Sequence, residues 1–188
     1  MVTKEDLIYR QVFTLKDGAR ILLRPLTIDD RQALLDLFLP VSADDLRYMR
    51  QNVKDPQVVG EWFDRLDYDK VLPLVAVFGS RIVGEATIHF NRGPYRHRAE
   101  VRIFLAKDFR RRGVGSRLLQ GVVEMAKRHN LFMLEVEIVS DQNHIIRAFQ
   151  SAGFEPKCVY EDYFMLPDGD LRDVTHLILK LRASDEAF

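Results

Sequence analysis

The chain has 188 residues, 47% of them hydrophobic, and its 28 basic and 28 acidic side chains give a formal net charge of zero. That length fits one domain with a substantial core, and the zero balance provides no overall attraction to nucleic acid or to an anionic membrane surface. The only cysteine, Cys158, excludes an intrachain disulfide and favours a reducing compartment. No apolar run reaches the ~18 residues of a membrane-spanning helix, and residues 1–10 lack the apolar core of a signal peptide, so we expect a cytoplasmic protein.

The first half of the chain predicts a strand, two helices and then a series of strands. The first strand is an apolar run over residues 20–26. Thr27 and Asp30 have the spacing of a capping box and predict a helix that continues to about Leu39. Asp55-Pro56 predicts the start of a second helix. Its apolar stripe is Val59, Trp62, Phe63 and Leu66. Turn signals then separate three predicted strands, at residues 74–78, 81–90 and 98–106.

The second half predicts strands that alternate with helices. Apolar residues recur at helical spacing over 114–126 and 145–152, and the second of these helices ends at Gly153. Strands are predicted at 132–138, 154–165 and 173–181. This pattern is typical of a mixed α/β fold. We therefore expect one domain over residues 1–188, with its core at about 20–181.

The segment between the strand at 98–106 and the helix that follows it predicts a phosphate site. Its sequence is Arg-Arg-Arg-Gly-Val-Gly-Ser over residues 110–116. The first turn of a helix leaves about four backbone N–H groups without partners, and the helix dipole also attracts an anion there. Glycine lets the backbone approach a phosphate closely, and arginine adds charge and forked donors. The loop is no P-loop, because it lacks Gly-Lys-Ser/Thr. Nor is it a dinucleotide fingerprint, whose third glycine would stand at Leu118.

The spacing of Arg110, Gly113 and Gly115 resembles the R/Q-x-x-G-x-G/A signature of the GNAT superfamily of N-acetyltransferases, and the resemblance extends from about Arg20 to Leu181. It implies a single-domain fold with a mixed, largely antiparallel sheet flanked by helices, in which a splayed strand pair holds acyl-CoA. It also implies that the loop binds the CoA pyrophosphate and that the strand backbone pairs with the pantetheine arm. The implied CoA-binding residues are Ile103, Phe104, Leu105, Arg110, Arg111, Arg112, Gly113, Val114, Gly115, Ser116, Asn143 and Phe149.

Asn143 and Phe149 lie on the predicted helix at 145–152 or just before it. In the superfamily an Asn and, seven residues later, an aromatic residue, often Tyr, lie near the CoA sulfur. Phe149 occupies the aromatic position, while seven residues before it stands Gln142 rather than Asn143. Either amide could contact CoA; we favour Asn143, which could also simply cap the helix. Phe149 cannot donate a proton, so the usual tyrosine acid is missing, and its ring also fits a core position.

Glu100 is the predicted general base, because in the superfamily a glutamate commonly stands on the strand that leads into the phosphate loop. The segment from Glu100 to Leu119 resembles bacterial protein-lysine acetyltransferases most. A lysine amine has a pKa near ~10.4, so a carboxylate must remove its proton, directly or through water. A strand N–H near Phe104 or Leu105 would stabilise the oxyanion. The alternative is a strand glutamate paired with Arg98 or Arg102.

We therefore expect acetyl transfer from acetyl-CoA to a primary amine, by direct attack in a ternary complex, with a protein lysine as the favoured acceptor. Two alternatives stay open: acetylation of a small amine, and a CoA-binding sensor without turnover. The acidic region with Asp44, Asp45 and Asp55 would suit a cationic acceptor of either size. The five histidines show no metal-ligand spacing, so no metal is expected. A homodimer stays open, and neither nucleic acid nor membrane is an expected partner.

Overall fold

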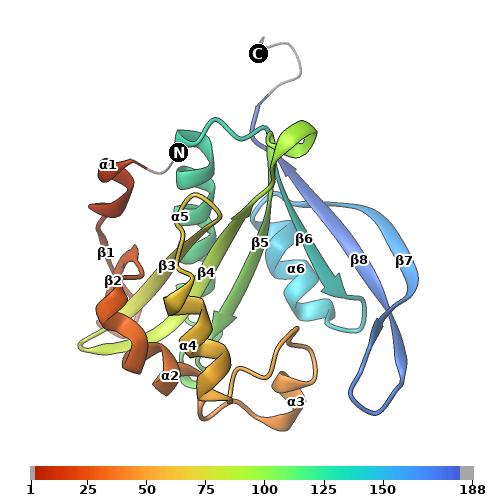
Figure 1. Cartoon of the computed structure of the whole chain (residues 1–188), viewed down its shortest axis with the longest axis horizontal. Coiled ribbons are helices and arrows are strands. Elements are labelled where there is room, and N and C mark those ends of the chain that lie inside the picture. The colour runs from red at the N-terminus through yellow and green to blue at the C-terminus, as the bar shows by residue number, and fades with distance from the viewer. Residues whose placement is uncertain (1–2, 183–188) are drawn as a thin grey trace.

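In the computed structural model, which describes residues 3–182, the chain forms one eight-stranded sheet in the order β1-β2-β3-β4-β5-β6-β8-β7 (Figure 1). The strands are β1 (Gln11–Thr14), β2 (Arg20–Pro25), β3 (Val71–Phe78), β4 (Arg81–Phe90), β5 (Arg98–Leu105), β6 (Met133–Val139), β7 (Glu155–Met165) and β8 (Leu171–Lys180). All neighbouring strands are antiparallel except β5 and β6, which are parallel. The mixed, largely antiparallel sheet flanked by helices confirms the predicted fold class.

Besides the strands, residues 3–182 form six α-helices and three short 3-10 helices. They are α1 (Lys4–Leu7), η1 (Ile28–Asp30), α2 (Arg31–Phe38), α3 (Ala43–Leu46), α4 (Pro56–Asp64), η2 (Gly93–Tyr95), η3 (Lys107–Phe109), α5 (Val114–Arg128) and α6 (Asn143–Ser151). Within the described part of the chain, none of these helices is long and apolar enough to cross a membrane.

The predicted helix starts are confirmed, with small differences at the ends. Asp55 accepts a hydrogen bond from the Gln57 N–H at the start of α4, but Leu66 follows the end of that helix. Gly153 has the positive φ, 94°, of a glycine that ends a helix. Strand β3 begins three residues earlier than predicted, at Val71. The short elements α1, β1 and α3 were not predicted.

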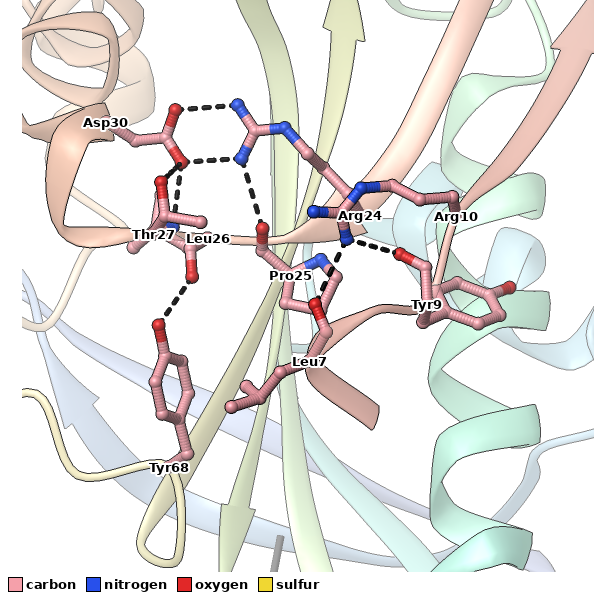
Figure 2. A network of polar contacts seen from close by, with 9 residues as sticks. All are labelled: Leu7, Tyr9, Arg10, Arg24, Pro25, Leu26, Thr27, Asp30 and Tyr68. Atoms are coloured by element: carbon pink, nitrogen blue, oxygen red, sulfur yellow. Dashed lines mark hydrogen bonds and ion pairs between the residues drawn. The ribbon is translucent and has the colours of Figure 1, made fainter. Parts of the chain in front are cut away.

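A polar network fixes the start of α2 against the sheet (Figure 2). Asp30 and Thr27 form the predicted capping box, in which Asp30 Oδ2 accepts from the Thr27 N–H at 2.7 Å. Arg24 on β2 donates to both carboxylate oxygens of Asp30, at 2.5 and 2.6 Å. The Tyr68 hydroxyl donates to the Leu26 carbonyl at 2.7 Å. These bonds hold α2, which covers one face of the sheet, in place.

Side-chain alternation along β5 separates the two faces of the sheet. Phe104 points toward α2, where its ring lies 5.3 Å from that of Phe38. Its neighbour Leu105 points toward α5, where a Cβ added at Gly115 would lie only 3.1 Å from Leu105 Cδ1. Helices α2 and α4 therefore lie over one face, and α5 over the other (Figure 1). Glu100, which has the same parity as Phe104, lies on the α2 face.

Strands β5 and β6 are paired over three residues only. The last matched pair is Glu100 with Glu135, and in the described residues β5 continues to Leu105 without β6 beside it. The two strands diverge from that point (Figure 1), and β6 pairs along its length with β8 instead. This is the splayed strand pair that the sequence predicted.

Candidate active site

The divergence of β5 and β6 leaves one edge of β5 without a neighbouring strand. The Ala106 N–H donates to the Val83 carbonyl of β4 at 3.0 Å. Because hydrogen bonding alternates along an antiparallel pair, Phe104 also directs its backbone groups toward β4. Ile103 and Leu105 direct theirs to the other side, where β6 no longer pairs. An extended ligand can therefore pair with the backbone of Ile103 and with the Leu105 N–H, since the Leu105 carbonyl accepts from Arg110.

The loop before α5 has the geometry of an anion site. Gly113 is the N-cap of this 15-residue helix and has φ of 89°, a left-handed conformation that favours glycine. Val114 is fully buried, so only its backbone faces the loop, whereas Ser116 is exposed. Gly115 allows the helix to lie close to Leu105. The free N–H groups at the start of this helix can therefore donate hydrogen bonds to an anion.

Two of the three loop arginines are already ion-paired. Arg110 donates to both carboxylate oxygens of Asp45, at 2.9 and 3.0 Å, and its Nε donates to the Leu105 carbonyl at 3.1 Å. The hydrogen bond from Arg110 lowers the pKa of Asp45. Arg112 pairs with Asp17. Arg111 is exposed and has no ion pair among the described residues, so the loop offers less free positive charge than its sequence suggests.

Glu100 lies within a set of charged partners on the α2 face. Its carboxylate accepts from Arg102 Nε and Nη2 at 3.0 and 3.1 Å, and it lies 2.8 Å from Arg50 Nη2. Burial raises the pKa of Glu100, but the hydrogen bond from Arg102 and the nearby cations outweigh it, so the pKa is lowered. Glu100 is therefore ionised at neutral pH and can accept a proton.

His89 lies directly opposite Glu100 on β4. Burial and, to a lesser degree, Arg102 lower the pKa of His89 to about 4, so the imidazole is neutral at neutral pH. Its Nε2 forms a hydrogen bond with Thr87 Oγ1 at 2.9 Å. A neutral imidazole beside the carboxylate can relay a proton without adding charge.

Glu85 is a second carboxyl on the same face, which the sequence analysis did not single out. Its strand partners are Val75 on β3 and Phe104 on β5, and its carboxyl has no partner among the described residues. Burial raises the pKa of Glu85 to about 7, although the residue keeps some solvent-accessible surface. Perturbed carboxyls of this kind are found preferentially at functional sites.

Helix α6 places the remaining predicted residues in different surroundings. Asn143 is exposed at its first position, where Nδ2 donates to the Asp141 carbonyl at 3.4 Å, and Gln142 is the preceding N-cap. Phe149 is buried, and its ring packs edge-to-face on Phe154 with centroids 5.0 Å apart. The core role of Phe149 is thus evident, while its contact with CoA stays a prediction.

The acidic region near α3 has other partners than those expected. Asp45 pairs with Arg110, and Asp55 caps α4. The acidic residue that shares Arg50 with Glu100 on the α2 face is Glu137 of β6, which accepts from Arg50 at 3.1 Å. No local motif marks Glu137 or Arg50. The pairing of β5 with β6 brings Glu137 near Glu100, and the segment after α3 brings Arg50 to both carboxylates.

Comparison with known proteins adds a family and a set of related folds. The sequence matches the Acetyltransferase (GNAT) family over residues 37–154, and no curated protein matches it. The GNAT domain of PAT from S. lividans has a TM-score of 0.77 at 20% identity, over 96% of this chain and 99% of that one. Ribosomal-protein-alanine N-acetyltransferase from Brucella melitensis has a TM-score of 0.74 at 23% identity, over 84% and 98%. The structure of yncA from Salmonella typhimurium with its cofactor acetyl-CoA has a TM-score of 0.71 at 18% identity, over 89% and 99%.

Proposed function

This chain belongs to the acetyltransferase (GNAT) family, whose reaction moves an acetyl group from acetyl-CoA to an amine, and we propose that its acceptor is a protein lysine and its general base is Glu100. The observation that carries the base assignment is the position of Glu100. It stands on the last pair shared by β5 and β6, where the strands part and the open edge of β5 begins. That edge leads directly to the phosphate loop.

The described residues fit acetyl-CoA, which supplies the acetyl group as a thioester. The backbone of Ile103 and the N–H of Leu105 are open to pair with the pantetheine arm, while the Leu105 carbonyl accepts from Arg110. The start of α5 and Arg111 provide donors and charge for the pyrophosphate. Asn143 at the start of α6 offers an exposed amide to the cofactor.

In the proposed reaction Glu100 takes a proton from the lysine ammonium, directly or through water. The neutral nitrogen then forms a bond to the acetyl carbon as the carbon–sulfur bond breaks, and CoA leaves as the thiolate. The second proton of the nitrogen passes to the thiolate or to water, which leaves the neutral amide. The acetyl oxygen can accept a hydrogen bond from the Leu105 N–H, which faces the open edge of β5. The Phe104 N–H faces β4 and is not available for this role. A thiol pKa lies near ~8.5, so the thiolate is a fair leaving group and a phenylalanine at 149 is compatible with turnover.

A protein acceptor is supported by three features. The segment from Glu100 to Leu119 resembles protein-lysine acetyltransferases, and the similarly folded Brucella melitensis enzyme is a ribosomal-protein-alanine N-acetyltransferase, whose acceptor is also a protein. The side chain of Glu100 is 23% exposed, so a lysine on another protein can approach it from solvent. A small amine is the second candidate, because Glu100 and Glu137 would accept a cation of either size.

The test is a panel of acceptors with acetyl-CoA, read out by free thiol and by mass spectrometry of the acceptor. We expect thiol release with lysine-bearing proteins or peptides, together with an acetyl group on a lysine side chain. Turnover of small amines alone would replace the protein acceptor by the small-molecule candidate. Binding of acetyl-CoA without thiol release for any amine would favour the sensor and contradict the proposed function.

A further inference from the structure

A single nitrogen of Arg50 lies between two carboxylates at the point where β5 and β6 part. Arg50 Nη2 is 2.8 Å from Glu100 Oε1 and donates to Glu137 Oε2 at 3.1 Å. Glu137 lies on the same face as Glu100, because Glu135, its neighbour two residues before, is the strand partner of Glu100. One cationic nitrogen is thus held by two strands at the proposed base.

Arg50 reaches this position from the segment that follows α3. Its side chain is 46% exposed, so it can turn into solvent without a change in the backbone. Glu100 and Glu137 are less exposed, at 23% and 32%. A cation that arrives from solvent therefore competes with Arg50 for the two carboxylates, while Arg102 stays paired with Glu100.

We propose that Arg50 is an internal competitor of the acceptor, and that its Nη2 marks the position of the acceptor amine between Glu100 and Glu137. The inference rests on the proposed function. A primary ammonium has three donors on one nitrogen and can bind the same two carboxylates. An arginine side chain stays protonated in proteins, so it occupies the position without being acetylated. Glu137 then becomes an acceptor-binding residue that helps to set specificity for a cationic amine.

The decisive variant is Arg50→Lys, which puts an acetylatable amine where the guanidinium lies. With acetyl-CoA we expect this lysine to become acetylated within its own molecule: its nitrogen bonds to the acetyl carbon, CoA leaves as the thiolate, and the amine proton passes to Glu100. Peptide mapping by mass spectrometry should find the modification at residue 50, at a rate independent of protein concentration. The matched control is Arg65→Lys, which alters an exposed arginine just after α4 that is paired with Glu61 and should stay unmodified.

A second variant measures the competition itself. Arg50→Ala should lower KM for a lysine acceptor by about two- to fivefold, the range expected for loss of a solvent-exposed ion pair. Glu137→Gln should raise KM instead. An unmodified residue 50 in an Arg50→Lys protein that binds acetyl-CoA, or a raised KM in Arg50→Ala, would overturn the inference while wild-type turnover upholds the proposed function. Absence of wild-type turnover with every amine would overturn both.

Discussion

Glu85 gives a stability prediction that follows from its surroundings. Burial among the apolar strand partners Val75 and Phe104 raises its pKa from 4.5 to about 7. In the folded protein the carboxyl thus holds its proton up to about pH 7, whereas the unfolded chain releases it near pH 4.5. The free energy of unfolding should therefore fall as the pH rises through this window. The full shift corresponds to roughly 3 kcal/mol, and residual solvent contact reduces the expected value to about 1–3 kcal/mol.

The variant Glu85→Gln keeps the shape of the side chain and cannot ionise. We expect urea unfolding to show that the free energy of unfolding of Glu85→Gln, relative to that of wild type, is higher at pH 8 than at pH 5. The control is Glu161→Gln, which alters an exposed glutamate of β7 and should show the same difference from wild type at both values. If Glu85→Gln were equally stable relative to wild type at pH 5 and pH 8, the account of Glu85 as a buried, protonated carboxyl would be wrong.

Three further variants test the cofactor side of the site. Asp45→Asn should free Arg110 and tighten acetyl-CoA binding by about two- to fivefold, as expected for removal of a competing ion pair; weaker binding by calorimetry would show that the pair supports the site instead. In Gly113→Asp the added Cβ meets nothing within 4 Å, but the positive φ of 89° strains any L side chain there, so folding of the variant is checked by thermal unfolding. The folded variant should lose acetyl-CoA binding through charge repulsion at the pyrophosphate, so unchanged affinity would refute the loop assignment. Phe149→Ala should cost about 3–5 kcal/mol of stability, the usual loss for a buried ring; a loss below ~1 kcal/mol in denaturant unfolding would contradict its core role.

Elements with local end signals were predictable from the sequence. The capping box at Thr27, the Asp55-Pro56 start and the glycine at 153 all act within a few residues, so their effect does not depend on the rest of the fold. The edge strand β1, in contrast, has only four residues and a single neighbour, β2. Such a short strand depends on its pairing partner rather than on its own pattern.

The site was predictable only where one segment carries it. The strand, loop and helix from Glu100 to Ser116 are continuous, so the motif places them together. The charge of the loop was overestimated, because Asp45 and Asp17, which neutralise two of its arginines, come from segments distant in sequence. Arg50 was missed for the same reason, because no sequence pattern connects it with Glu100 of β5 and Glu137 of β6, with which it forms ion pairs.

Burial could not be inferred for single polar residues either. Glu85 stands in an otherwise apolar strand, and a sequence pattern does not tell whether such a residue points to water or is covered by a helix. The structure shows the covered arrangement, with α2 lying over its face of the sheet. The unusual pKa of Glu85 is thus a consequence of tertiary packing.

The central claim, that Glu100 is the general base, is tested most directly by the rate of acetyl transfer as a function of pH in wild type and Glu100→Gln. Binding of acetyl-CoA should stay near the wild-type value, since the positions proposed for the thioester and the pyrophosphate are farther along β5. Turnover at neutral pH should fall about 10²–10⁴-fold, the usual contribution of a general base, and the residual rate should rise with pH as more of the amine is neutral. Normal turnover of Glu100→Gln at neutral pH would contradict the assignment, and a comparable loss in Glu85→Gln alone would transfer the role to that carboxyl.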